Sequence, residues 1–586
     1  MIDVQWSLGE HGEDAEGLLA DWAAEDVASR LWARDTTLWS PDPATPELAD
    51  RLGWLDLPET SEALGPDLAN FAAGIPFWMT DLVLLGMGGS SLAPEVLART
   101  IGGGGLPLTV MDSTHPQAVR DLEWINPANT IFIVASKSGT TLETLSLFRH
   151  FWSRTREVVE EPGAHFVAIT DPGSPLVDLA RERGFRAVFE APSDLGGRFS
   201  ALSPFGLVPA ALMGLDVATL LSGAVEAADA CREPAPHNPG LRLGAALAGL
   251  ARTGRDKVTF VTRSQFDAFP DWIEQLIAES TGKDGTGLVP IAREPQRDVG
   301  DYGSDRVFVG VVSPASVSEA SAKWGEEDDS LARLEALAAE GHPVIRIEID
   351  REDDLGGLFF VSEVAVAMVG SALGIHPFNQ PDVEFAKQLA REAMARPAVA
   401  AESAGEPYDA PEEPRGADVG EIDLAWEIAP YGHANPATPA EPDVMGIEDG
   451  VDAFLDELSA GDYVGIQAYL AGGDEEELEE LQHLRDALTT ATGAATTLGY
   501  GPRFLHSTGQ LHKGGPDRCA FLQLVDDAGP HVPVPETEFT FHQLIRAQSH
   551  GDLAALSQRG RRVLRVRVGP STEGIGRLIQ VIERER

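Results

Sequence analysis

The chain has 586 residues, more than one hydrophobic core usually covers, so we expect several domains. Its formal net charge of −49 argues against binding to nucleic acid and to anionic membrane surfaces. Only two cysteines are present, Cys231 and Cys519, without the spacing of a metal site or of a disulfide framework. Such sparse cysteine usage is typical of a protein of the reducing cytoplasm.

The chain has 43% hydrophobic residues and a mean hydropathy of −0.10, values that are typical of a globular protein. The longest apolar stretch, residues 359–373, is interrupted by Ser362, Glu363 and Ser371, so we expect no membrane span. No basic segment followed by an apolar run lies near Met1, so we expect no secretory signal. These observations predict a cytoplasmic protein.

Changes in sequence pattern divide the chain into five parts. Residues 1–64 are predicted to be a helical segment, 65–220 and 221–395 two tandem α/β domains, 396–445 an acidic, proline-rich linker, and 446–586 a smaller C-terminal α/β domain. Short apolar runs alternate with helical stretches in the three domains, as in parallel sheets covered by helices. The predicted strands are residues 82–85, 106–111, 130–135, 165–170, 186–189, 257–262, 306–311, 344–349, 462–470, 495–500, 519–524 and 563–568.

The first motif, residues 84–91, is a strand that runs into a glycine-rich turn and then into a predicted helix at residues 92–100. Glycines let a ligand approach the backbone, and a helix N-terminus offers free N–H groups to an anion. A dinucleotide-binding turn is the alternative, with Asp112 as the ribose ligand. Ser91 stands where that fingerprint has its third glycine, so the turn suits a single phosphate better.

The second motif, residues 131–144, again joins a buried strand to a helix, and its turn contains hydroxyl side chains around Lys137. Hydroxyls and N-terminal amides together bind and orient a phosphate monoester. A helix cap is the alternative, but it accounts for only one or two of the hydroxyls.

Two further segments place a charged side chain at a turn or at the end of a helix. Arg198 lies on a glycine turn and could stabilise an oxyanion without contacting a neighbouring side chain; a surface arginine on a structural turn is the alternative. Residues 272–279 have the apolar spacing of an amphipathic helix, which ends with Glu279 before a Ser-Thr-Gly break. Glu279 is the candidate general base, and a solvated helix-end carboxylate is the alternative.

A fourth motif, residues 376–387, follows a buried helix and leads into another, with Pro381 suited to its first turn and Lys387 two turns further. Lysine is rare in this chain, with six lysines among 44 basic residues. Four of the six lie in candidate functional motifs: Lys137, Lys283, Lys387 and Lys513.

Taken together, residues 86–90, 136–141, 196–200, 275–283 and 380–387 resemble the glucose-6-phosphate isomerase family, in the family's order. The resemblance implies two flavodoxin-like, three-layer sugar-isomerase (SIS) domains with the site between them, usually in a homodimer. It implies conversion of glucose 6-phosphate to fructose 6-phosphate through a cis-enediol, without metal or other cofactor. A catalytically silent or regulatory phosphosugar-binding protein, or an isomerase of another hexose 6-phosphate, is the alternative.

The resemblance also implies roles for individual residues. Gly89, Ser90, Ser136, Ser138 and Thr141 would hold the substrate phosphate, with Lys137 and Thr140 in the same turn; Arg198 and Gln275 would line the sugar; Glu279 would transfer the proton; Gln380 and Lys387 would act around the ring oxygen and hydroxyls.

The sequence departs from the family at one position. In the family, a histidine that lies twenty to thirty residues after the catalytic glutamate opens the sugar ring. The matching segment of this chain is residues 297–306, and it contains no histidine. The C-terminal domain offers a glycine-rich loop at residues 499–515 that resembles the extension of isomerases fused to transaldolase. We predict that His506 or His512 of this loop opens the ring, and that Lys513 contacts the sugar. A loop that only seals an interface, with both histidines hydrogen-bonded to the backbone, is the alternative.

Overall fold

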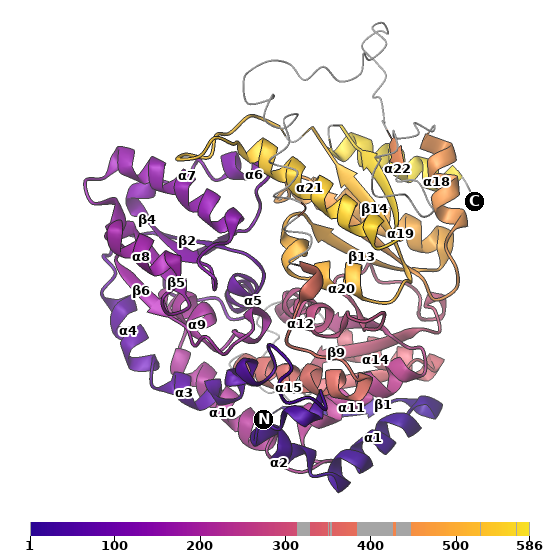
Figure 1. Cartoon of the computed structure of the whole chain (residues 1–586). Helices are drawn as coiled ribbons and strands as arrows, with labels where there is room; N and C mark the ends of the chain where they lie inside the picture. The colour runs from indigo at the N-terminus through magenta and orange to yellow at the C-terminus, as the bar shows by residue number, and fades with distance from the viewer. Residues whose placement is uncertain are drawn as a thin grey trace, which may run out of the picture. The chain divides into compact units, whose positions relative to one another are not determined.

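The computed structural model of the chain describes residues 2–312, 329–349, 351, 354–383, 389, 426–428, 447–527, 529–569 and 571–584 (Figure 1). It divides into two units, each of which is described by itself. Unit 1 comprises Met1–Asp112, Ile125–Arg293 and Arg297–Gln380, and unit 2 comprises Ser113–Trp124, Glu294–Gln296 and Pro381–Arg586.

The first sheet of unit 1 has five parallel strands in the order β3-β2-β4-β5-β6. Its strands are β2 (Asp81–Gly86), β3 (Leu108–Met111), β4 (Thr130–Ala135), β5 (Phe166–Thr170) and β6 (Ala187–Glu190). In chain order this arrangement is 2-1-3-4-5, the flavodoxin-like order, so the predicted fold class is confirmed. The chain changes direction across the sheet between β2 and β4, where ligands bind in folds of this type.

The second sheet of unit 1 has the order β1-β10-β9-β7-β8, with β1 antiparallel and the others parallel. Its strands are β1 (Asp3–Ser7), β7 (Lys257–Thr262), β8 (Val289–Ile291), β9 (Arg306–Val312) and β10 (Val344–Glu348). The prediction of helix throughout residues 1–64 is therefore wrong at its start. β1 was missed because an edge strand needs no continuous apolar run, and its only fully buried side chain is Val4.

Helices join the two sheets of unit 1 into one core (Figure 1). The α-helices are α1 (Glu13–Ala24), α2 (Val27–Trp32), α3 (Leu57–Glu62), α4 (Gly65–Ala73), α5 (Leu92–Thr100), α7 (Leu142–Val158), α8 (Pro175–Glu182), α9 (Pro204–Leu212), α10 (Val217–Ala230), α11 (Pro239–Arg252), α12 (Phe269–Thr281), α14 (Ser330–Glu340) and α15 (Leu355–Leu373). α15 is long and apolar enough to cross a membrane, but 89% of its apolar window is buried inside the protein, where it packs against α10 and α11. It is the central helix of the core.

The sheet of unit 2 has the order β11-β15-β14-β12-β13, with β11 antiparallel and the others parallel. Its strands are β11 (Trp426–Ile428), β12 (Tyr463–Tyr469), β13 (Ala495–Tyr500), β14 (Cys519–Val525) and β15 (Arg562–Arg567), and its helices are α6 (Pro116–Asp121), α18 (Ile447–Asp456), α19 (Glu475–Thr492), α20 (Gly509–Gly514), α21 (Phe541–Gln558) and α22 (Ser571–Arg584). Apart from β11 and α6, these elements match the predicted small C-terminal α/β domain. Strand for strand, the order repeats that of the second sheet of unit 1.

The two faces of this third sheet differ in polarity. Alternate residues such as Ile466, Leu522 and Leu564 belong to an apolar cluster with α18, α19 and α22. The opposite face carries Gln467, Gln523 and Arg565 in register across β12, β14 and β15. This buried row is polar, and packing alone does not require it.

The predicted linker lies mostly outside the described residues, as does Lys387. Within the linker, Trp426–Ile428 pairs with β15 through Trp426↔Val566. The segment that the sequence predicts to be a linker therefore supplies an edge strand from its middle.

Candidate active site

The two phosphate-type motifs lie at the carboxyl ends of β2 and β4, where the chain changes direction in the first sheet. β2 leads into a 3-10 turn at Gly88–Ser90 and then into α5. A Cβ atom on Gly89 would lie 2.1 Å from the carbonyl oxygen of Gly197, so only glycine lets the two glycine turns approach this closely. The Gly89 turn and the Arg198 turn are thereby held together.

The hydroxyls of the second motif hydrogen-bond in pairs in the turn between β4 and α7. Ser136 Oγ lies 2.9 Å from Thr141 Oγ1, and Ser138 Oγ lies 2.9 Å from Thr140 Oγ1. Ser136 is buried, whereas Ser138 and Thr140 are exposed. The turn therefore presents exposed hydroxyls at the N-terminus of a 17-residue helix, a suitable place for a phosphate group.

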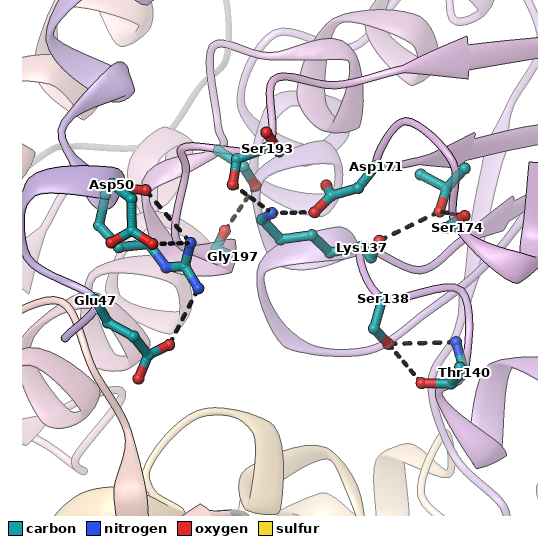
Figure 2. Close-up of polar contacts among 12 residues, drawn as sticks. Glu47, Asp50, Lys137, Ser138, Thr140, Asp171, Ser174, Ser193 and Gly197 are labelled. Carbon is teal, nitrogen blue, oxygen red and sulfur yellow. Dashed lines mark hydrogen bonds and ion pairs between the residues drawn. The ribbon is translucent and has the colours of Figure 1, made fainter.

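Lys137 is ion-paired with Asp171, which follows β5, and donates to the carbonyl oxygen of Ser193 at 3.3 Å (Figure 2). Burial raises the pKa of Asp171, while the Lys137 ammonium acts in the opposite direction. Asp171 was missed by sequence reasoning. Its position after a buried parallel strand was the signal that could have found it, because carboxyl ends of such strands share one edge of the sheet.

Arg198 is buried, and its guanidinium joins three segments of unit 1. It donates through Nε to Ser280 Oγ at 2.8 Å and through Nη1 to Glu279 Oε2 at 3.1 Å. It donates further to Gln380 Oε1 at 2.7 Å, and through Nη2 to the carbonyl oxygens of Pro377 (2.6 Å) and Asn379 (3.1 Å).

The expectation that Arg198 stands clear of neighbouring side chains is wrong, because a buried guanidinium needs acceptors for its N–H groups. Burial lowers the pKa of Arg198, and the Glu279 carboxylate opposes this shift.

Glu279 lies on α12, two residues before the helix ends at Thr281, and Gln275 lies one turn earlier on the same helix. Both are buried, so the predicted helix end is nearly right but Glu279 is not a solvated carboxylate. Its carboxylate forms an ion pair with Arg198 at 3.1 Å. A carboxylate in a dry, positively charged place is suited to proton transfer.

Lys283 follows α12 and connects it to the loop that carries Gln380. Its Nζ donates to the carbonyl oxygens of Ser280 at 3.3 Å and His376 at 2.5 Å. Burial lowers the pKa of Lys283 well below its usual value of 10.5, and the Arg198 charge adds to this shift. Lys283 thus helps to fix Gln380 relative to Glu279.

A loop near the N-terminus also adds charge to this region, although sequence reasoning found no chemistry there. His376 Nε2 lies 3.0 Å from the carbonyl oxygen of Pro46, and Arg51 donates to Glu47 at 3.0 Å. Figure 2 shows Glu47 and Asp50 of this loop. Glu47 acts electrostatically on Arg198 and Lys283. No sequence signal could have found this loop, because nothing in its pattern separates Glu47 and Arg51 from surface residues.

In residues 297–306, the segment where the family has its histidine, Arg306 and Tyr302 contact other side chains of unit 1. Arg306 is buried and donates to Thr259 Oγ1 at 2.8 Å, and the Tyr302 ring packs edge-on against Phe308 with centroids 4.9 Å apart.

Asp112, the ribose ligand of the dinucleotide-binding alternative, is buried and lies 3.5 Å from Ser91 Oγ. In the described part of the chain, no three His, Cys, Asp or Glu side chains are grouped to hold a metal ion.

Unit 2 holds the remaining predicted residues. His512 is buried between the rings of Phe504 and Phe521, and its Nδ1 lies 3.2 Å from Gln467 Nε2. Burial lowers its pKa well below 6.5, and Lys513 and Arg561 act in the same direction. Lys513 is buried in an ion pair with Asp552 at 2.6 Å. His506 is only partly buried, so of the two histidines it is better placed to exchange protons with solvent.

The helix predicted to carry Lys387 begins in unit 2, since residues 381–383 are helical. Asp382 is held there by two side chains of the C-terminal domain: Gln510 Nε2 donates to it at 2.7 Å, and Arg559 forms an ion pair with it. The domain therefore contacts the fourth motif itself, at Asp382.

Comparison with known proteins gives consistent relatives. Residues 74–289 match the phosphoglucose isomerase family. A glucose-6-phosphate isomerase of Rubrobacter xylanophilus is 32% identical over 431 residues, which cover 66% of this chain and 96% of that protein. A glucose-6-phosphate isomerase of Thermus thermophilus is 31% identical over 384 residues, which cover 60% of this chain and 91% of that protein.

Solved structures share the fold. A hypothetical protein from Thermus thermophilus matches with a TM-score of 0.59 and 27% identity, over 67% of this chain and all of that one. A glucose-6-phosphate isomerase from Chlamydia trachomatis matches with a TM-score of 0.51 and 20% identity, over 67% and 88% of the two chains.

Proposed function

Because this chain belongs to the glucose-6-phosphate isomerase family, we propose that unit 1 carries an active site in which Glu279 moves a proton between two carbons of a phosphosugar. The enzyme interconverts glucose 6-phosphate and fructose 6-phosphate. The observation that carries the assignment of the base is the buried Arg198–Glu279 pair, which Gln380 completes. A catalytically silent phosphosugar-binding protein is not favoured.

The substrate phosphate binds at the carboxyl ends of β2 and β4. Ser138, Thr140 and Thr141 turn from their mutual hydrogen bonds to the phosphate oxygens, with Ser136 behind them and Gly89 and Ser90 on the neighbouring turn. Asp171 fixes the Lys137 ammonium at the turn, where its N–H groups can donate to the phosphate. Binding energy gained at the phosphate positions the carbons that react.

Proton transfer follows from the charges around Glu279. The carboxylate takes the proton from C2 of the open-chain aldose and returns it to C1, and the negative charge of the enediolate develops beside the Arg198 guanidinium. Arg198 is already held by five hydrogen bonds, so little reorganisation is needed. Gln275 and Gln380 orient the sugar hydroxyls, and Lys387, outside the described residues, acts at the ring oxygen.

Ring opening needs a group that gives and takes a proton near neutral pH. His506 is the candidate, because it is partly exposed while His512 is buried among aromatic rings. The test measures anomerisation and isomerisation separately in His506→Ala and His512→Ala. We expect His506→Ala to slow anomerisation far more than isomerisation of open-chain substrate; wild-type anomerisation in both variants would contradict the idea.

The assembly and location follow the family. We infer a homodimer, as the family resemblance implies, working in the cytoplasm. Both cysteines are buried and free, which suits a reducing compartment.

A coupled assay of the purified protein with glucose, mannose and glucosamine 6-phosphates tests the function. We expect turnover with glucose 6-phosphate and its loss by about 10²–10⁴-fold in Glu279→Gln, since the charge and the proton acceptor are lost while shape is kept. Glucose 6-phosphate should bind both proteins within a few-fold. Turnover of Glu279→Gln near the wild-type rate would remove Glu279 from the mechanism.

A further inference from the structure

The polar face of the third sheet fixes a buried arginine near the carboxyl ends of the strands. Arg565 of β15 donates through Nε to Gln523 Oε1 at 2.7 Å and through Nη2 to the carbonyl oxygen of Ser549 at 2.6 Å. Gln523 in turn donates to Gln467 Oε1 at 3.0 Å. The row of side chains thus holds the Arg565 guanidinium in a single orientation.

A cavity of about 70 Å³ opens beside this guanidinium, at the carboxyl ends of β14 and β15. Its polar lining consists of Arg546, Ser549 and His550 from α21, Arg565 and Arg567 from β15, and Asp526 after β14. This volume is several times the roughly 10–15 Å³ that a cavity needs to hold one water, so a small oxyanion group fits. In open α/β sheets, ligands bind at this edge.

The charges around the cavity are predominantly positive. The Arg546 guanidinium forms no hydrogen bond or ion pair with any other residue that the structure describes, and it is only partly exposed. Asp526 lies 3.1 Å from His115, and Arg567 lies 3.7 Å from the largely exposed Asp527, a weak pair. The chain has 93 acidic and 44 basic residues, so an arginine that forms no ion pair with them is unusual. We therefore expect the guanidinium of Arg546, which lies beside the cavity, to pair with an anionic ligand.

We propose that this cavity of unit 2 binds a small oxyanion, a phosphate group, at a site separate from the active site. Arg565 is fixed in advance by Gln523, Arg546 supplies free N–H donors, and Ser549 and His550 complete the lining. Guanidinium groups match the geometry of phosphate oxygens and keep their charge at every physiological pH. The phosphate is either free or the head of a phosphosugar.

Titration calorimetry of the full chain with inorganic phosphate at low ionic strength tests the site. Ser138→Ala with Thr141→Ala provides the background, because it weakens phosphate binding at the active site. In that background, we expect one remaining phosphate site per chain, weakened at least tenfold by Arg546→Ala and less by Arg546→Lys. Arg584→Ala is the matched control, since it removes an exposed arginine of α22 that does not line the cavity.

The remaining outcomes decide between sources or overturn the site. Glucose 6-phosphate binding that is at least tenfold tighter than that of inorganic phosphate in the background protein, and that Arg546→Ala weakens, identifies a phosphosugar as the ligand of the cavity; glucose 6-phosphate binding that Arg546→Ala leaves unchanged identifies free phosphate. Absence of phosphate binding in the background protein, or binding unchanged by Arg546→Ala with the thermal transition intact, overturns the proposal. Isomerase turnover of Arg546→Ala without added phosphate should equal that of the wild type, so this test is independent of the proposed mechanism.

Discussion

The first sheet of unit 1 and the sheet of unit 2 share the order of their first four parallel strands, but matching loops carry different chemistry. After β2 and β4, hydroxyls and glycines lead into α5 and α7. After β12, which matches β2, α19 begins with Glu475, Glu476 and Glu477, which repel an anion from that helix terminus. In unit 2 the basic residues lie instead beside β14 and β15. Topology therefore fixes the edge where ligands bind, and loop side chains decide which ligand.

Both units also bury an ion pair, and the two pairs differ in their neighbours. In the first pair, Arg198 also donates to Gln380 and to the carbonyl oxygen of Pro377, about 180 residues further along the chain. Lys513 and Asp552 are sealed, with 1% and 0% of their side chains exposed. We interpret the first pair as catalytic and the second as structural, and the predictions below separate these interpretations.

Asp552→Ala should have the largest effect, on stability rather than on turnover. It leaves the Lys513 ammonium buried without its counter-ion, which costs about 3–5 kcal/mol of unfolding free energy. Hydrogen exchange of β12 and β14 peptides measures this loss in unit 2. A large fall in kcat with unchanged exchange would instead favour Lys513 as a substrate-binding residue, as the sequence predicts.

Arg198→Lys should lower kcat/KM by about 10²–10³-fold, since one ammonium cannot make the hydrogen bonds of the guanidinium or meet the enediolate in the same way. Steady-state kinetics of the coupled reaction measure the effect. Arg306→Lys is the matched control, a buried arginine of β9 whose replacement should leave kcat/KM of the folded enzyme within a few-fold. Equal losses in both variants would mean that Arg198 acts only through folding.

Ser138→Ala with Thr141→Ala should raise KM strongly and change kcat little. Each lost hydrogen bond to a charged group is worth about 1.5–3 kcal/mol, which corresponds to roughly tenfold or more in KM. Thr219→Ala, which removes an exposed hydroxyl at the start of α10, is the control and should leave KM unchanged. An unchanged KM in the double variant would place the substrate phosphate elsewhere.

The smallest effect concerns pH and one buried histidine in each unit. Burial lowers the pKa of His150 to about 4 and that of His512 well below 6.5. Below pH 6.5 the unfolded chain binds protons that the folded histidines do not, so the stability they contribute is present above pH 6.5 and is lost as pH falls. Each histidine contributes at most about 1.4 kcal/mol per pH unit.

His150→Gln and His512→Gln should flatten this pH dependence, each in its own unit. Urea unfolding at pH 7.5 and pH 5, followed by hydrogen exchange of α7 and of β14, measures the two slopes. Slopes equal to the wild-type values would show that other groups dominate the acid side.

Much of the fold could be predicted because buried parallel strands are continuous apolar runs. β4, β7 and β13 begin and end where the sequence predicts them. β8 and β11 were missed because three-residue strands are too short for a periodic signal.

The site was predictable as loops and helix ends, since glycines, hydroxyls and the end of α12 are local features. Its internal pairing was not. Arg198 meets Glu279 and the carbonyl oxygen of Pro377 only because distant segments pack together, and the charge of Glu47 reaches them from a loop without any pattern. Burial of Lys513 and His512 likewise depends on α21 and β14, which the local sequence of α20 does not reveal.

The antiparallel strand β1 has a consequence for synthesis on the ribosome. Asp3 pairs with Glu348, so β1 is translated roughly 340 residues before its partner β10, on the order of 20–70 s earlier at 5–20 residues per second. During that interval the unpaired backbone of β1, with Trp6 on it, is available to other strand edges. The second sheet therefore cannot close until well over half of the chain has left the ribosome, and nascent chains stalled before β10 are the species in which this N-terminal strand is open to chaperones or to misassembly.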